Sequence, residues 1–581
     1  MKYTIVFILL LGAAACKRSG SPAPNNNNNN SNPTQPADST YNPVDPALPP
    51  TIGFFGAGWA PRTFNAPPDN PASVSTSLPV SDSLVIDVNR VVEKVPPTVF
   101  GNNSNLWMGQ IVTQSNLMQY IKDLSPNIIR APAGSISDTY FWNGTDANPK
   151  PADAPDSVYT SGALGSIGSW YGGDAASWTL SLANYYSLLS QTNSTAIFTV
   201  NYGYARYGTG ASPVDSAAHL AAGWVRADNG RTKYWEIGNE CYGNWEAGYQ
   251  IDVSKNKDGQ PAIVTGALYG THFQVFADSM RAAAKSVGAT IYIGAVLYGT
   301  PPQSYDDNTV QTWNQGVLSN AGSVADFFII HDYFTAYNAN STVPQILSTG
   351  LSEAPADMSY IKQQLQNAGV AAKPVAMTEW NIQASGSKQN TSYIAGMHAV
   401  LTLGTFMQNG YGEASRWDLA NGYANGDDMG MFNIGDEAGA PLWNPRPAFY
   451  YLYYFQRMFG DRMVFDTLKH ADADITAYSS TFSSGQAGTI IVNASATIHV
   501  VSIDFQHFPA GSKYRWYTLT GGTDNSPFSG QVFVNGTGPS TATGGPLNYA
   551  SIPAGSAVLS GTIKIAISPM SVVYLVADGK P

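Results

Sequence analysis

The sequence predicts an α/β protein in which a (β/α)8 TIM barrel is followed by a C-terminal antiparallel β-sandwich. Between residues 96 and 460, strand-like segments alternate with helix-like segments eight times. Such alternation indicates a parallel sheet covered by helices, and eight repeats suit a closed barrel. After Gly460 the helix-like segments stop, and short strands separated by turn residues follow one another. A doubly wound open sheet fits less well, because no glycine-rich nucleotide-binding motif follows the first strand.

The N-terminus is typical of an exported protein. Lys2 precedes an apolar run over 5–11, and small residues then lead to Cys16. The run is too short to span a membrane, and the pattern is typical of a secretory signal peptide. The small residues before Cys16 resemble the lipobox of bacterial lipoproteins, in which the chain is cut before the cysteine and the cysteine is lipidated. We therefore expect a signal peptide over 1–15 and an outer-membrane lipoprotein, on the periplasmic or the cell-surface face, held to the membrane only by its lipid.

Two segments precede the barrel. Residues 16–50 contain an asparagine run and many prolines with little to bury, so we expect a disordered tether. Residues 51–95 form an N-terminal arm. Its end, 84–92, alternates apolar and β-branched residues and is expected to add a strand to the sandwich. The role of the aromatic residues earlier in the arm stays open.

The barrel elements, within 96–460, follow from their local patterns. Apolar and β-branched runs that end in polar or small residues predict strands, and longer segments with apolar residues three or four apart predict helices. Gly460 ends the last helix. The predicted strands are 99–105, 127–131, 196–202, 233–239, 290–296, 327–331, 375–378 and 414–417. The predicted helices include 115–124, 177–191, 214–227, 272–286, 358–367, 393–408 and 446–460.

The C-terminal domain, 461–581, contains only short alternating segments between turns, which predicts antiparallel strands. The predicted strands are 475–480, 488–493, 499–505, 513–519, 557–567 and 572–577.

Composition excludes some classes of function. The 581 residues are 43% hydrophobic and 12% charged, which is enough for two large cores. The formal charge of −11 argues against nucleic acid, which binds basic surfaces, and suits a neutral glycan. Cys16 and Cys241 are the only cysteines, so lipidation of Cys16 leaves no intramolecular disulfide. Cys241 is expected to be a small buried residue, because no motif for thiol catalysis accompanies it.

Two carboxylates end buried strands. The stretch 233–240 ends in Asn239 and Glu240, and the stretch 373–381 places Glu379 in a similar position. In a parallel barrel the C-terminal strand ends form the active face, and the fourth and seventh strands face each other across it. Paired carboxylates about 5–5.5 Å apart suit hydrolysis of a glycosidic bond with retention, one acting as proton donor and the other as nucleophile.

The motifs Trp-Glu-Ile-Gly-Asn-Glu240 and Thr-Glu379-Trp-Asn resemble the acid/base and nucleophile motifs of glycoside hydrolase clan A, and within it the α-L-arabinofuranosidases of family 51. The resemblance extends from about residue 84 to the C-terminus. It is also carried by Phe-Gly-Asn at 100–102, Arg130-Ala-Pro-Ala-Gly, His331-Asp-Tyr and Asn-Pro-Arg-Pro-Ala-Phe-Tyr-Tyr at 444–451.

The resemblance implies specific roles for the residues of these motifs. Glu240 is then the general acid/base and Glu379 the nucleophile. Asn239 donates to the sugar 2-hydroxyl, and the remaining polar residues orient Glu379 or the sugar. These are Arg130, His331 and Tyr333. Retaining hydrolysis needs neither a metal nor a cofactor.

Departures from the family pattern leave the substrate open. Ala131 and Ala133 stand where the family usually has an aromatic residue and glycine, and Asn102 lies where an acidic residue is usual. Three functions remain. The first is an exo-acting α-L-arabinofuranosidase that removes sugars from a poly- or oligosaccharide. The second is a xylanase-like or agarase-like endo-glycanase of the same clan. The third is a non-catalytic glycan-binding lipoprotein, which the presence of both glutamates and Asn239 disfavours.

Other side chains near the strand ends are candidates for substrate or ion binding. Sugar rings stack on flat aromatic faces, so we expect substrate contacts from four tryptophans. They are Trp142, Trp245, Trp380 and Trp417. Acidic residues over 252–258 are spaced differently from a calcium-binding loop and alternate with lysines, so we expect a polar hairpin there.

Overall fold

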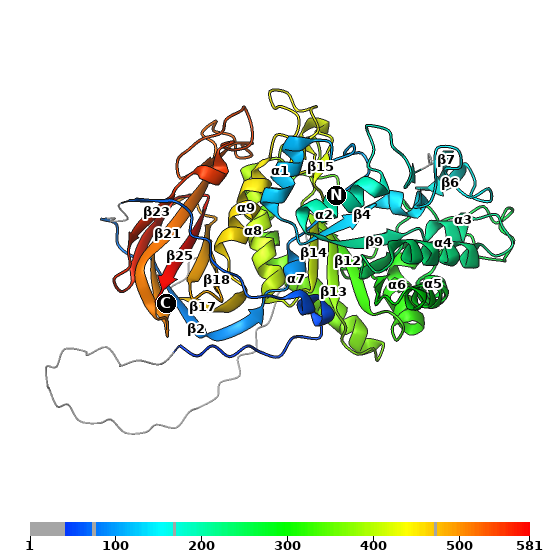
Figure 1. The fold of residues 1–581 in the computed structure, drawn as a ribbon, viewed down its shortest axis with the longest axis horizontal. Helices are drawn as coiled ribbons and strands as arrows, with labels where there is room; N and C mark the ends of the chain where they lie inside the picture. The colour runs from blue at the N-terminus through cyan, green and yellow to red at the C-terminus, as the bar shows by residue number, and fades with distance from the viewer. Residues whose placement is uncertain (1–40, 73–76, 167–169, 470–472, 581) are drawn as a thin grey trace, which may run out of the picture. The chain divides into compact units, whose positions relative to one another are not determined.

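The computed structural model describes residues 41–72, 77–166, 170–469 and 473–580 (Figure 1). The predicted signal peptide 1–15, the predicted lipidation site Cys16 and the tether up to residue 40 lie outside the described residues. No helix in the described ranges is long and apolar enough to cross a membrane.

Eight parallel strands form a closed barrel, which confirms the predicted (β/α)8 fold. Each strand pairs with the next one along the chain, and the eighth pairs with the first. Every barrel strand overlaps its predicted segment. The strands are β3 (Gly101–Asn103), β4 (Ile128–Ala131), β9 (Thr195–Val200), β10 (Tyr234–Ile237), β11 (Tyr292–Val296), β12 (Phe327–Tyr333), β13 (Val375–Asn381) and β14 (Glu413–Arg416).

Helices connect the barrel strands. Several begin at the side-chain caps expected of helix starts, such as the reciprocal capping box between Thr342 and Gln345 at the start of α7. The helices are α1 (Ser115–Leu124), α2 (Leu182–Thr192), α3 (Gly203–Tyr207), α4 (Pro213–Asp228), α5 (Gly266–Ser286), α6 (Asn308–Ala321), α7 (Val343–Asn367), α8 (Tyr393–Gln408) and α9 (Pro447–Met458).

The C-terminal domain is one long, mostly antiparallel sheet that folds over its own core. Apolar side chains of β2, β20 and β24 share a buried cluster with those of β18, β19 and β25. As predicted, the early run at 84–92 joins this sheet: β2 pairs with β17 and β20. The strands are β1 (Asp69–Pro71), β2 (Asp82–Lys94), β17 (Arg462–Lys469), β18 (Ile475–Thr481), β19 (Ala487–Asn493), β20 (His499–Gln506), β21 (Ala510–Gly521), β22 (Val532–Val534), β23 (Ala554–Val558), β24 (Ile563–Ile567) and β25 (Ser571–Gly579).

Helices α8 and α9 lie between the barrel and the sandwich (Figure 1). Every side chain of α8 from Ile394 to Met407 is buried. Phe406 packs on Trp380 of the barrel, and the Thr405 hydroxyl lies 3.0 Å from that of Tyr478 in the sandwich. Hydroxyl groups of the sandwich reach both helices: Tyr478 donates to the carbonyl of Leu401, and Tyr574 donates to that of Tyr451, both at 2.8 Å. The two domains therefore form a continuous packed body.

The N-terminal arm closes the barrel at the end opposite the expected active face. Its short helix η1 (Gly53–Gly58) places Phe54 on the ring of Tyr292, with ring centroids 3.8 Å apart. Phe55 is fully buried against Tyr234 and Phe327. Since these partners stand at the starts of three barrel strands, the arm is a plug for the N-terminal end of the barrel.

Residues 41–50 require a correction to the predicted tether. Val44 forms a β-bridge with Arg90, and Asp45 forms an ion pair with Arg462 at 2.6 Å. This part of 16–50 is therefore attached to the sandwich, because Asp45 and Val44 find specific partners that composition alone does not reveal.

Candidate active site

Six of the predicted polar residues converge at the C-terminal end of the barrel. Arg130 lies in β4, His331 and Tyr333 lie in β12, and Glu379 lies in β13. Asn239 and Glu240 directly follow β10. All these strands are parallel, so their C-terminal ends open at the same mouth.

The two carboxylates lie close enough to act on one bond. One carboxylate oxygen of Glu240, one of Glu379 and one ring nitrogen of His331 all lie within 4.8 Å of one another. The side chain of Glu379 is 5% exposed and that of Glu240 is 17% exposed. Enzymes that activate a water between the carboxyl groups hold them about 6.5–9.5 Å apart, so this shorter separation favours direct attack by one of them.

Glu379 is held by one donor on each oxygen. Arg130 Nη1 donates to Oε1 and the Tyr333 hydroxyl donates to Oε2, both at 2.7 Å. These bonds fix the plane of the carboxylate. The residue therefore presents a pre-oriented oxygen to the mouth, as a nucleophile requires.

Arg130 links the strands beneath the carboxylates. Its side chain is fully buried, and its guanidinium donates to Glu236, Asn103 and Asn239 as well as to Glu379. Burial alone lowers the pKa of Arg130, but the carboxylates of Glu236 and Glu379 raise it above its ordinary value. The planar fork is suited to several acceptors at once, which a lysine cannot reach together.

Glu240 has different surroundings from Glu379. One oxygen lies 3.0 Å from His331 Nδ1, and the other accepts from the indole nitrogen of Trp245 at 2.9 Å. Burial raises the pKa of Glu240, but the hydrogen bond and charge of His331 and the Trp245 bond lower it, and the net pKa lies below the ordinary value. Its φ of 39° is in the left-handed region, which turns the side chain back over the mouth.

The ring of His331 is fixed on both sides. Nε2 lies 3.0 Å from the hydroxyl of Thr378, while Nδ1 faces Glu240. With a proton on Nδ1, the ring donates to Glu240. The histidine is thus oriented toward Glu240 by the strand that carries Glu379.

Two residues that support the site were not predicted. Glu236, in the middle of β10, accepts from Arg130 Nε and from the hydroxyl of Thr199, both at 2.7 Å. Asn103, at the end of β3, donates to the carbonyl of Thr378 at 2.8 Å. The alternation of side chains along a strand could have indicated Glu236, because this charged residue interrupts an apolar strand at a position that faces the inside of the barrel.

The four predicted tryptophans divide into two groups. Trp245 is 44% exposed beside Glu240, and the half-buried Trp417 lies next to Gly134 in the loop after β4. Trp142 and Trp380 do not reach the mouth. Trp142 donates to the carbonyl of Leu220 in α4 and stacks on Trp224 of the same helix, outside the barrel.

Trp380 also requires correction as a substrate contact. It is 2% exposed and packs edge-on against Phe406 of α8. Successive side chains of a strand point to opposite faces, so when Glu379 points into the barrel mouth, Trp380 points out toward the helices.

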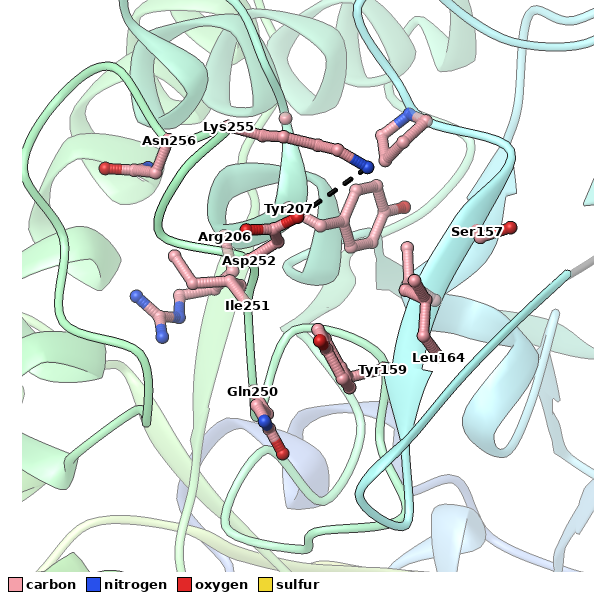
Figure 2. A pocket seen from close by; sticks show the side chains of 13 residues that line it. Ser157, Tyr159, Leu164, Arg206, Tyr207, Gln250, Ile251, Asp252, Lys255 and Asn256 are labelled. Carbon is pink, nitrogen blue, oxygen red and sulfur yellow. Dashed lines mark ion pairs between the residues drawn. The ribbon is translucent and has the colours of Figure 1, made fainter.

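The acidic hairpin after β10 is held by its own polar groups. Asp252 lies 3.7 Å from Lys255, and Asn256 donates to Asp258. Figure 2 shows the pocket beside this hairpin, with the ion pair drawn as a dashed line. The pocket holds about 20 Å³, which is room for one water molecule rather than a sugar.

Comparisons with known proteins identify the fold. No family model matches the sequence, and no curated protein matches it. Among solved structures, the chain is similar to an α-L-arabinofuranosidase from Thermotoga maritima, with a TM-score of 0.59, 16% identity and coverage of 85% of this chain and 99% of that one. A GH51 α-L-arabinofuranosidase from Thermotoga petrophila gives a TM-score of 0.59 and 16% identity, covering 86% of this chain and 100% of that one.

A family 44 xyloglucanase from Paenibacillus polymyxa is also similar, with a TM-score of 0.53, 12% identity and coverage of 85% of this chain and 99% of that one. At the level of the fold, the likeness to the arabinofuranosidases confirms the resemblance that the motifs indicated. It extends over the barrel and the sandwich together.

Proposed function

We propose that this protein is a retaining glycoside hydrolase in which Glu379 is the nucleophile and Glu240 is the general acid/base. The observation that carries the proposal is the short distance between the two carboxylates: their nearest oxygens lie within 4.8 Å across the barrel mouth. Similar solved structures named as glycosidases support a carbohydrate substrate.

In the first step, Glu379 attacks the anomeric carbon while Glu240 gives a proton to the leaving oxygen. The carbon–oxygen bond to the leaving group breaks, and a covalent glycosyl ester forms on Glu379. Glu240 must be protonated for this step. Burial is the largest influence on its pKa and raises it, so a substrate that displaces water from Glu240 favours the protonated acid.

In the second step, Glu240 takes a proton from water as the water attacks the glycosyl ester. The ester has removed the charge of Glu379, and His331 and Trp245 still hydrogen-bond to Glu240. These bonds keep the pKa of Glu240 below its ordinary value, which suits a base. One residue therefore serves as acid and then as base, because its surroundings change between the steps.

The remaining residues of the site bind and orient. Arg130 and Tyr333 hold Glu379 in the attacking position. Asn239 is fixed between Arg130 and the loop after β10, with an amide hydrogen available to a sugar hydroxyl. Trp245 and Trp417 offer flat faces at the rim for sugar rings.

We propose an α-L-arabinofuranoside as the substrate, on the strength of the motifs and of the arabinofuranosidases among the similar structures. An endo-glycanase is the second candidate. The observation that favours it is the likeness to a bifunctional glucanase-xylanase, which has a TM-score of 0.56, 14% identity and coverage of 86% of this chain and 99% of that one. The same pair of glutamates serves either substrate.

A panel of aryl glycosides and plant polysaccharides tests this function. Wild type is compared with Glu240→Ala and Glu379→Ala. We expect release of single sugars from the arabinofuranoside by wild type and a loss of at least about a thousandfold in both variants. Oligosaccharide products indicate endo action instead. Turnover that is unchanged in both variants contradicts the mechanism, and binding without turnover by wild type indicates a non-catalytic protein.

We also propose that the chain is exported and lipidated on Cys16. The apolar run and the small residues before Cys16 support this. Labelled palmitate should enter the wild type and not Cys16→Ala, and the variant should move from the membrane fraction to the soluble fraction. Equal labelling of both excludes Cys16, and protease treatment of whole cells distinguishes the cell-surface from the periplasmic face.

A further inference from the structure

A third glutamate lies directly behind the proposed sugar contact. Glu246 stands in the loop after β10, and its side chain is fully buried. Its Oε1 accepts from Asn239 Nδ2 at 2.9 Å and from the Ser135 hydroxyl at 2.7 Å. Ser135 belongs to the short helix η3 (Ser135–Thr139) after β4. One oxygen of Glu246 thus links the segment after β10 to η3 at the barrel mouth.

The other oxygen of Glu246 has no donor. Oε2 is buried and has no hydrogen-bond partner among the residues that the structure describes. An ionised carboxylate has two acceptor oxygens and no donor, so a buried oxygen without a donor is costly for the charged form. Protonation lowers this cost, because it removes the buried charge while Oε1 still accepts both bonds.

Charges around Glu246 act in the same direction. Asp138 of η3 and the catalytic candidate Glu240 face it, and both are acidic. Arg130 is engaged with other carboxylates, and Ser135 and Asn239 are neutral. Burial, followed by the charges of Asp138 and Glu240, raises the pKa of Glu246 well above its ordinary value, against the smaller effect of its two hydrogen bonds.

We propose that Glu246 is a positioning residue that acts as a neutral carboxylic acid and locks the amide of Asn239 toward the sugar. Asn239 Oδ1 accepts from Arg130 at 2.8 Å, so the amide can be held only with Nδ2 toward Glu246. One Nδ2 hydrogen goes to Glu246, and the second is then directed at a substrate hydroxyl. This role deepens the proposed function and rests on it.

Four variants test the role by activity: two single replacements of Glu246, Asn239→Ala, and the double alanine variant. Glu246→Gln keeps an acceptor oxygen at permanent zero charge, so it should retain kcat/KM within about threefold. Glu246→Ala leaves the buried amide of Asn239 without its acceptor and should lose about tenfold to a hundredfold. The double variant of Asn239→Ala and Glu246→Ala should lose no more than Asn239→Ala alone, because Glu246 acts through Asn239.

Two outcomes overturn the proposal. If Glu246→Gln falls as far as Glu246→Ala, a charge is needed at this position. If the losses of the two alanine variants multiply in the double variant, Glu246 does not act through Asn239. Failure of the proposed function looks different, because wild type then hydrolyses no member of the glycoside panel.

A measurement of stability tests the neutral state without turnover. A carboxyl whose folded pKa is raised keeps its proton in the native state after the unfolded chain has lost it, so stability falls as pH rises above about 4.5. The amide that Glu246→Gln introduces does not titrate and has no such loss. The melting temperature of Glu246→Gln minus that of wild type should therefore increase from pH 5 to pH 8. A difference that stays constant over this range shows that Glu246 is already ionised in the native state and contradicts the proposal.

Discussion

Replacing Arg130 with lysine should weaken both the fold and the activity. The guanidinium makes four hydrogen bonds, to Glu236, Asn103, Glu379 and Asn239, at 2.7, 3.2, 2.7 and 2.8 Å. An ammonium group occupies one point and cannot reach acceptors on both sides of the fork. If it stays near Glu379, it loses Glu236, whose side chain is fully buried. A broken buried ion pair costs about 3–5 kcal/mol.

Urea unfolding followed by tryptophan fluorescence measures this cost, and kcat/KM on the best aryl glycoside measures the effect on Glu379. We expect destabilisation of about 3–5 kcal/mol and a loss of kcat/KM of at least about a hundredfold. Arg462→Lys is the matched control. Its partner Asp45 has a side chain that is 33% exposed, so the change should cost less than about 1 kcal/mol. Equal effects of the two substitutions would refute the assignment of Arg130 as the central link.

Three further predictions concern titratable groups and Glu379. Burial raises the pKa of Glu93, which is 4% exposed, to about 9. The native protein therefore keeps a proton that the unfolded chain loses, and wild type loses stability as pH rises from about 4.5. In urea unfolding, Glu93→Gln should be about 3 kcal/mol more stable than wild type at pH 7 and no more stable at pH 4. His331→Gln removes a major cause of the lowered pKa of Glu240, so the pKa of Glu240 should rise. Because Glu240 must be protonated to act as the acid, the alkaline limb of the pH profile of kcat/KM should move to higher pH. An unmoved limb contradicts this. Tyr333→Phe removes one of the two donors to Glu379 and should lower kcat/KM by about tenfold to a hundredfold, whereas wild-type rates would show that this bond is dispensable.

The barrel and the place of its mouth were predictable because buried parallel strands leave continuous apolar runs. Each run ends at a polar residue, and parallel strands bring those ends to one face. The strand pattern alone therefore predicted that Glu240 and Glu379 lie close together. The bond between His331 and Glu240 could not be predicted in this way, because it depends on the φ of 39° that turns Glu240 over the mouth.

Side-chain direction limited the prediction of aromatic contacts. Trp380 follows Glu379 in the strand, and strict alternation alone would have placed it outside the mouth. Trp142 lies in a long loop without periodicity, and only the packing of α4 shows that it faces Leu220. Glu246 lies in a similar loop, so its contact with Asn239 also had no signal in the sequence.

Helix α7 and the arm show the same limit for secondary structure. The predicted helix began at residue 358, whereas α7 begins at Val343 and continues through Pro355. A proline inside a helix normally indicates an end, and here the capping box at Thr342 and packing on α8 outweigh it. The arm is non-periodic because its aromatic residues fill the end of a barrel, and that surface exists only after the barrel has closed.

Rescue by azide tests the two assigned carboxylate roles most directly. Glu240→Ala should accumulate the glycosyl ester from an aryl glycoside with a good leaving group, and azide should then attack the ester and give a glycosyl azide with the configuration of the substrate. In Glu379→Ala, azide should replace the missing nucleophile and give the opposite configuration. Proton NMR of the anomeric centre distinguishes the two products. If Glu240→Ala instead gave the inverted azide and Glu379→Ala the retained one, the roles of the two glutamates would be exchanged. If neither variant gave an azide product, the double-displacement mechanism would be contradicted.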